Sequence, residues 1–258
     1  MLGAICGDVI GSVYEHENLK SKDFTLFQKA CAFTDDTVLS CAVAASLIHG
    51  RPFEANIKRF YSWYPKAGYG FMFSKWAKSD NEPAYNSYGN GSAMRVSPVA
   101  WVYDTLDEVL EAAKRTAEVT HNHPEGIKGA KMIAGAVFLA RRGASKRDIE
   151  KLGRDFDYDM DRRLDEIRPD YHFKATCQES VPEAVIAFLE SESFEDAIRN
   201  AVSIGGDSDT IACMTGSIAE AFYGGIPDDI REQTLSFLDE RLRGIFGLFE
   251  DKYIDTRK

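Results

Sequence analysis

Two short acidic motifs carry the side chains that are best suited to chemistry in this chain. One reads Phe-Thr-Asp-Asp-Thr over residues 33–37, and the other reads Gly-Gly-Asp-Ser-Asp-Thr over residues 205–210. Each precedes an apolar helical pattern, so its carboxylates and hydroxyls gather at a helix N-terminus, where backbone amides favour negative charge. A plain helix cap needs one oxygen acceptor. Each motif instead supplies consecutive acids and hydroxyls, which favours a role beyond capping.

The chemistry that these groups favour is the binding of a hard metal ion. If the fold brings the two motifs together, four carboxylates converge, and two like charges about 4 Å apart cost about 4 kcal/mol at an effective dielectric near 20. Such a cluster needs a cation, and oxygen ligands select Mg²⁺, Mn²⁺ or Ca²⁺. An EF-hand does not fit, because the twelfth position counted from Asp207 falls at Ile218, where a bidentate acid is required.

Composition indicates an ordinary globular protein. With 258 residues, 44% of them hydrophobic, the chain can form one large domain with a substantial core, and we predict a single domain over residues 1–258. The formal net charge of -10 argues against a basic nucleic-acid-binding surface, so we expect no nucleic acid as a stable partner. We expect the protein to be a monomer.

The cysteines and the N-terminal residues predict a cytoplasmic location. The five cysteines are scattered and form no Cys-x-x-Cys pair, which is typical of reduced, buried thiols. No basic region precedes the first apolar residues, and Asp8 follows soon after, so we expect neither a signal peptide nor a lipid anchor. No apolar run reaches the length of a membrane span, and we expect no membrane partner.

The elements that position the motifs are predicted to be helices throughout. Alternating β-branched patterns are nearly absent, so the predicted fold class is all-α, one compact multi-helix domain of roughly ten or more helices. Gly3, Gly7 and Gly11 recur every four residues within a helical pattern over residues 2–14, which predicts that another helix crosses there very closely. The aromatic-rich segments 53–64 and 69–76 are predicted to be mostly core. Further helices are expected over residues 38–48, 106–119, 127–140, 181–188, 194–204 and 211–219, and from Pro227 onward.

Three further features carry weaker signals. Glycines flank Asn90 at the start of a helical pattern, and the exposed amides of such a turn can hold a pyrophosphate, although an ordinary Asn-Gly turn is the alternative. His121 and His123 are two residues apart and do not converge on a helix face, so no zinc pair is expected. A histidine there could hydrogen-bond a substrate hydroxyl or phosphate, or Asn122 or His123 could cap the next helix. Glu15 precedes a polar loop and is of interest only if the metal cluster lies nearby.

Taken in order along the chain, the motifs resemble the ADP-ribosylglycohydrolase family, which includes the dinitrogenase reductase-activating glycohydrolase. The resemblance spans residue 2 to about residue 245, and the two acidic motifs are its most specific part. It rests on Gly7-Asp8, Gly11-Ser12, Glu15, Phe33 to Thr37, Gly89 to Arg95, Thr120-His121 and Gly205 to Thr210.

The resemblance implies a binuclear site for two Mg²⁺ or Mn²⁺ ions in an all-α fold. Thr34, Asp35 and Asp36 would hold one ion. Asp207, Asp209 and Thr210 would hold the second, with Asp209 bridging both. The implied substrate-binding residues are His121 on one wall and, along the diphosphate and distal ribose, Asn90, Gly91, Ser92, Ala93 and Met94.

The implied activity is hydrolysis of the glycosidic bond between ADP-ribose and an acceptor, an ADP-ribosylated protein or a small conjugate. The transition state of this hydrolysis has oxocarbenium character. The metals would orient the ribose and activate a water molecule. Asp36, Asp209 or Glu15 would transfer the proton. The linkage stays open among arginine, serine, a nucleic-acid phosphate or base, and O-acetyl-ADP-ribose. Residues 145–175 match the family less clearly and are predicted to influence substrate preference, as is the loop after Glu15.

Two other functions compete with this reading. A catalytically inert ADP-ribose-binding protein on the same fold would be expected to have lost motif acids, yet all four aspartates are present. A Mg²⁺-dependent phosphatase of the haloacid dehalogenase type needs Asp-x-Asp-x-Thr after a strand, whereas Thr210 stands one place early and the preceding segment reads as a helix.

Overall fold

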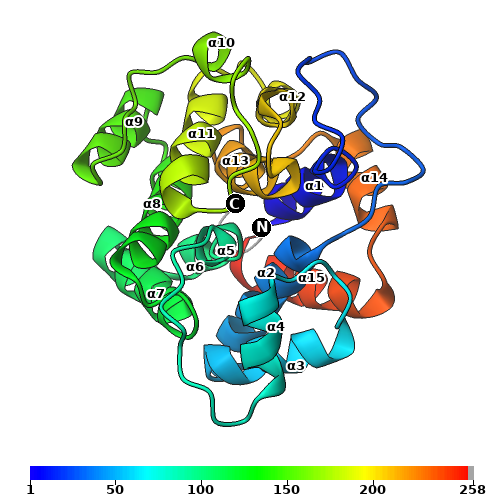
Figure 1. The fold of residues 1–258 in the computed structure, drawn as a ribbon, viewed down its shortest axis with the longest axis vertical. Coiled ribbons are helices and arrows are strands. Elements are labelled where there is room, and N and C mark those ends of the chain that lie inside the picture. Colours follow the sequence, from blue (N-terminus) through cyan, green and yellow to red (C-terminus); the bar gives the residue numbers. More distant parts are fainter. Residues whose placement is uncertain (255–258) are drawn as a thin grey trace.

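The computed structural model describes residues 1–254, and all regular secondary structure in that part of the chain is helical (Figure 1). An isolated antiparallel bridge between Gly89 and Thr176 is the only β-type pairing found among these residues. The all-α prediction is therefore confirmed. In chain order the helices are α1 (Leu2–Gly11), α2 (Asp35–His49), α3 (Phe53–Trp63), α4 (Phe71–Lys78), α5 (Gly91–Met94), α6 (Val99–Val102), α7 (Leu106–Glu118), α8 (Pro124–Arg141), α9 (Lys146–Asp155), α10 (Leu164–Ile167), α11 (Cys177–Leu189), α12 (Phe194–Ile204), α13 (Ser208–Phe222), α14 (Asp228–Ser236) and α15 (Glu240–Tyr253).

The centre of the fold is the contact between α1 and α13, which lie side by side in Figure 1. A Cβ atom placed on Gly7 would lie 2.0 Å from the carbonyl oxygen of Ala212, and one on Gly3 would lie 2.1 Å from that of Gly216. Only glycine allows backbones to approach this closely. The predicted close helix crossing is confirmed, and it places the start of α13 beside the last turns of α1.

The helix boundaries follow local capping chemistry. Helix α2 begins where the Thr34 side chain accepts a hydrogen bond from the Asp36 amide, and it ends at Gly50 in the left-handed conformation (φ 63°). Helix α8 begins at Pro124, three residues before the predicted start, because the His123 side chain accepts a hydrogen bond from the Glu125 amide. His123 is therefore a helix cap, one of the two roles that its position allowed.

Several predicted helix boundaries differ from the structure. The first helix ends at Gly11 and not at residue 14. The Ser12 hydroxyl donates a hydrogen bond to the carbonyl oxygen of Val9, and the chain then enters a long loop. Pro227 is the N-cap of α14 and not its first helical residue. Phe60, Tyr61, Phe73 and Trp76 are buried as predicted for the aromatic segments, but Phe71 is 81% exposed.

The core is dominated by aliphatic and small side chains, and all five cysteines lie in it as free thiols. This agrees with the prediction of buried, unpaired cysteines. Within residues 1–254, no helix combines the length and the apolar composition that a bilayer crossing requires.

Candidate metal centre and ligand cleft

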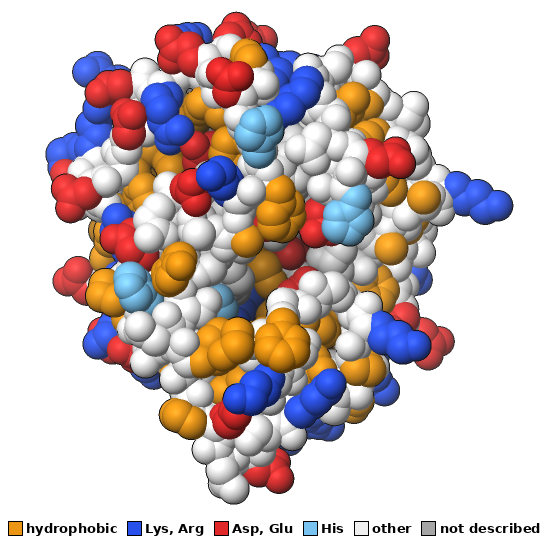
Figure 2. All heavy atoms as spheres, viewed as in Figure 1, with side chains coloured by type: hydrophobic (Ala, Val, Ile, Leu, Met, Phe, Trp, Pro, Cys, Tyr) orange, Lys and Arg blue, Asp and Glu red, His pale blue; other side chains and the backbone are white. Residues whose placement is uncertain are grey.

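A cleft of about 490 Å³ contains most of the residues that the sequence singled out. Figure 2 shows the hollow near the middle of one face, with acidic side chains inside it. The predicted site residues that line it are Glu15, Thr34, Asp35, Asp36, Asn90, Gly91, Met94, His121, Asp207, Asp209 and Thr210. A second cavity of about 610 Å³ lies at the other end of α13 and contains none of them.

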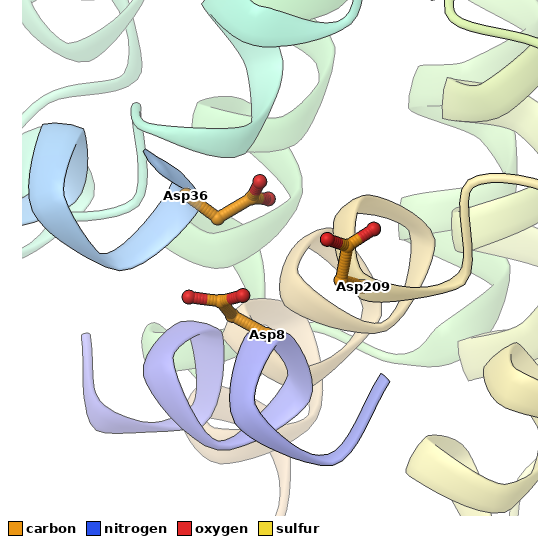
Figure 3. Close-up of side chains that lie close together, drawn as sticks. All are labelled: Asp8, Asp36 and Asp209. Atoms are coloured by element: carbon orange, nitrogen blue, oxygen red, sulfur yellow. The ribbon is translucent and has the colours of Figure 1, made fainter. Parts of the chain in front are cut away.

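Three buried carboxylates meet at the base of this cleft. Asp8, Asp36 and Asp209 come from α1, α2 and α13, and Figure 3 shows their carboxylates pointing toward one another. One oxygen from each lies within 4.8 Å of the others. The Thr210 hydroxyl donates to Asp36 Oδ2 at 3.2 Å, so residues from both acidic motifs are in direct contact.

Asp8 organises the start of α2. Its Oδ2 accepts hydrogen bonds from the amides of Thr34 (2.9 Å) and Thr37 (3.0 Å) and from the Thr37 hydroxyl (2.5 Å), while its Oδ1 accepts from the Thr34 hydroxyl (2.7 Å). Four donors use most of the lone pairs of a carboxylate. Asp8 therefore fixes the motif that carries Asp35 and Asp36, and it retains little capacity to bind a metal itself.

The carboxylates are strongly destabilised as anions when no cation is bound. Burial raises the pKa of Asp35 to about 8, with Asp8 and Asp207 adding to the rise. Burial, followed by the nearby carboxylates, also raises the pKa values of Asp36 and Asp209 well above their ordinary range. Asp36 Oδ1 is buried and makes no hydrogen bond to any described residue. An orphaned carboxylate oxygen among carboxylates and hydroxyls fits a hard divalent cation.

The second acidic motif is held from the opposite side of the cleft. The Asn90 side-chain amide donates to Asp207 Oδ2 at 2.7 Å and to the Ser180 hydroxyl at 3.2 Å. The Asn90 amide N–H donates to the carbonyl oxygen of Ala175 at 2.9 Å. Asn90 thus connects the glycine loop to the N-cap of α13. This is a positioning contact that the Asn-Gly turn pattern did not predict.

Glu15 lies at the mouth of the cleft with 29% of its side chain exposed. Burial raises the pKa of Glu15 and Asp207 raises it further, while His16 opposes the rise. The loop that carries Glu15 is fixed to the second motif, because Asn18 accepts a hydrogen bond from the Gly206 amide at 2.7 Å and donates to the Glu15 carbonyl oxygen at 3.1 Å. The position of Glu15 is therefore coupled to the Gly205-Gly206 turn.

The glycine loop and His121 form one wall. A Cβ atom on Gly91 would lie 3.2 Å from His121 Nε2, so glycine leaves room for the imidazole beside the cleft. Ser92 and Ala93 do not line the cleft: both are buried, and the Ser92 hydroxyl donates to the carbonyl oxygen of Gly126 at 2.8 Å. These two residues hold the loop against α8 from behind.

Several cleft residues had no clear signal in the sequence. Asp8 appeared only as part of a Gly-Asp pair in the family resemblance. Phe71, Met72 and Phe173 form an exposed apolar rim around the opening, drawn from two distant segments. Arg95 lies in the wall, fully buried. Arg95 appeared only as the last residue of the Gly89 to Arg95 motif in the family resemblance.

Comparison with known proteins agrees with this arrangement. The family model described as ADP-ribosylglycohydrolase matches residues 1–254. The chain is 29% identical to ADP-ribosylhydrolase ARH3 of Gallus gallus, in an alignment that covers 87% of this chain and 84% of the relative. It is 28% identical to ADP-ribosylhydrolase ARH3 of Homo sapiens, with the same coverage of both chains.

A solved structure has the same fold. It is described as an ADP-ribosylglycohydrolase-related protein complex and aligns with a TM-score of 0.72 at 24% identity. The alignment covers 97% of this chain and 96% of that chain.

Proposed function

Because the chain belongs to the ADP-ribosylglycohydrolase family, we propose that it is a metal-dependent hydrolase that releases ADP-ribose from an ADP-ribosylated acceptor. The observation that carries the metal dependence is the buried cluster of Asp8, Asp36 and Asp209, with one Asp36 oxygen lacking any hydrogen-bond partner among residues 1–254. Burying several carboxylates without a cation or protons is costly.

The two acidic motifs would hold two Mg²⁺ or Mn²⁺ ions. Thr34, Asp35 and Asp36 would bind one, and Asp207, Asp209 and Thr210 the other. Bound cations would supply Lewis acidity, which orients the ribose hydroxyls and lowers the pKa of a water molecule.

The protein's own groups would perform three tasks around the anomeric carbon. The carboxylates of Asp36 and Asp209 would stabilise the positive charge that develops in an oxocarbenium-like transition state. Glu15 would exchange a proton with the attacking water or the leaving group, since its raised pKa brings the carboxyl closer to neutral pH. The wall formed by Asn90, Gly91, Met94 and His121 would bind the diphosphate and ribose.

The test uses a panel of defined substrates that carry ADP-ribose on arginine, on serine, on a nucleic-acid phosphate or as O-acetyl-ADP-ribose. We expect release of ADP-ribose from at least one of them, loss of activity with EDTA and recovery with Mg²⁺ or Mn²⁺. Asp36→Asn serves as the inactive control. Binding of ADP-ribose without turnover of any substrate would instead support the inert ADP-ribose-binding alternative.

A further inference from the structure

Three buried polar side chains form a continuous hydrogen-bonded row that begins in the wall of the cleft. Arg95 Nη2 lies 2.9 Å from the Thr120 hydroxyl oxygen, and this oxygen lies 2.7 Å from His121 Nδ1. Arg95 and Thr120 are fully buried and His121 is 5% exposed. The other ring nitrogen, Nε2, lies toward the glycine loop, 3.2 Å from the position that a Cβ atom on Gly91 would take.

The direction of the hydrogen bonds in this row follows from the chemistry of the arginine. A guanidinium has only donors and keeps its charge, so Arg95 must donate and the Thr120 oxygen must accept. Arg95 Nε and Nη1 are buried without a partner among the described residues, so donors already outnumber acceptors around this group. The Thr120 hydroxyl still has its own proton, and His121 Nδ1 is the acceptor at hydrogen-bond distance.

The phenol of Tyr85 lies beside this row, with its ring centroid 6.0 Å from that of His121. Burial raises the pKa of Tyr85 to about 12, so the phenol keeps its own proton at pH 7. The side-chain atoms at hydrogen-bond distance from the Thr120 hydroxyl are Arg95 Nη2 and His121 Nδ1.

The charge state of His121 agrees with an accepting Nδ1. Burial lowers the pKa of His121 well below 6.5, and the positive charge of Arg95 lowers it further. A neutral imidazole carries one proton, and which nitrogen carries it is set by the hydrogen bond that the other nitrogen makes. With Nδ1 accepting from Thr120, the proton lies on Nε2.

We propose that Arg95 and Thr120 are positioning residues that hold His121 as the neutral Nε2–H tautomer, so that the ring presents a hydrogen-bond donor and not a lone pair to the cleft. Under the proposed function, on which this step rests, His121 selects an acceptor oxygen of the bound ligand, a phosphate or ribose oxygen of ADP-ribose. The same assignment excludes His121 as a general base, because the nitrogen facing the cleft has no free lone pair.

The direct test is the tautomer of His121 in the ligand-free protein, measured by long-range ¹⁵N–¹H correlation NMR at pH 7 on protein labelled at its histidines. We expect a protonated Nε2 and an unprotonated Nδ1 in the parent. Thr120→Ser keeps the hydroxyl and should keep this pattern. Thr120→Val removes the donor to Nδ1 and should produce a mixture of tautomers.

A matched control is available one turn earlier on α7. Thr116 is also fully buried, and its hydroxyl donates to the carbonyl oxygen of Ala113 at 2.7 Å. Thr116→Val makes the same chemical change without touching His121, so it should leave the tautomer unchanged. A protonated Nδ1 or an imidazolium in the parent would overturn the proposal, as would an unchanged tautomer in Thr120→Val. If Thr120→Val does not fold, the parent and Thr120→Ser spectra still decide the assignment.

Ligand binding gives a second readout that separates this proposal from the proposed function. By calorimetry, Thr120→Val should bind ADP-ribose about 3- to 10-fold more weakly than the parent, the loss expected for one misdirected neutral hydrogen bond. Thr116→Val should stay within about twofold of the parent. Parent protein that shows the Nε2–H tautomer but does not bind ADP-ribose would refute the proposed ligand and leave the positioning role in place. Parent-like affinity in Thr120→Val with a changed tautomer would show that Nε2–H does not contact the ligand.

Discussion

Replacing Asp209 with asparagine should move activity and stability in opposite directions. Asp209 is one of the residues proposed to hold a metal ion, so Asp209→Asn should remove most activity. In the metal-free protein the same change deletes one of three carboxylates whose oxygens lie within 4.8 Å of one another. The metal-free variant should therefore unfold at the same temperature as the metal-free parent or at a higher one.

The distance sets the scale of this gain. Two ionised carboxylates 4.8 Å apart repel by about 3.5 kcal/mol at an effective dielectric of 20. The gain is smaller near neutral pH, because the raised pKa of Asp209 keeps part of the cluster protonated. A group whose pKa is raised on folding adds stability below its unfolded pKa, and this stability is lost as pH rises through the folded pKa. The metal-free parent should thus lose stability between about pH 4 and pH 8, and the variant should lose less.

Four melting curves at each of two pH values test this reasoning: parent and variant, each with and without Mg²⁺, measured at pH 6 and again at pH 8. For a protein of this size, 1 kcal/mol corresponds to about 2 °C, so the metal-free variant should melt up to about 7 °C above the parent at pH 8. Mg²⁺ at 100 times its Kd should stabilise the parent by about 2.7 kcal/mol and the variant much less. If the variant keeps the parent's Mg²⁺ shift and its rate of hydrolysis, Asp209 is a helix-capping residue and the account of this motif is wrong.

Four further predictions concern the cation, the cleft and the fold. EDTA should abolish hydrolysis and Mg²⁺ or Mn²⁺ should restore it, with no need for Zn²⁺; full activity of metal-stripped protein would contradict the proposed centre. Glu15→Gln should lower turnover by about 100-fold and change the free energy of unfolding by no more than about 0.5 kcal/mol. Normal turnover with a large loss of stability would show that Glu15 has a structural role. Gly91→Val should weaken ADP-ribose binding by about tenfold or more, because the added carbons meet the His121 ring, while circular dichroism stays normal. Equal affinity of variant and parent would remove the loop from the site. Gly7→Ala should lower the free energy of unfolding, measured with a chemical denaturant, by about 3 kcal/mol or more, because its Cβ would lie 2.0 Å from a backbone oxygen of α13. Parent-like stability would show that α1 can shift.

The features that could be predicted from the sequence depend on local patterns. The apolar helical periodicity predicted the all-α class, and the four-residue spacing of Gly3, Gly7 and Gly11 predicted a close helix crossing. The two acidic motifs could be paired because each repeats the same unusual chemistry at a helix start. Only the identity of the partner helix, α13, required the structure.

The features that could not be predicted depend on contacts between distant segments. Asp8 is a single acid in an apolar helix, and the residues that give it a role, Thr34 and Thr37, lie 26 and 29 positions further along the chain. The apolar rim joins Phe71 to Phe173, and the aromatic segment that contains Phe71 has the composition of a core. Composition cannot show which ring of such a segment faces outward.

The glycine-lined contact between α1 and α13 also determines when the site can form during synthesis. All ten residues of α1 are buried in the folded protein, yet the surface that covers them belongs to a helix made about 200 residues later. Because translation proceeds at about 5 to 20 residues per second, α13 is synthesised about 10 to 40 s after α1. A nascent chain that stops before residue 208 therefore exposes α1 and has only two of the three clustered acids, Asp8 and Asp36, so ribosome-bound chains of that length should recruit chaperones until α13 emerges.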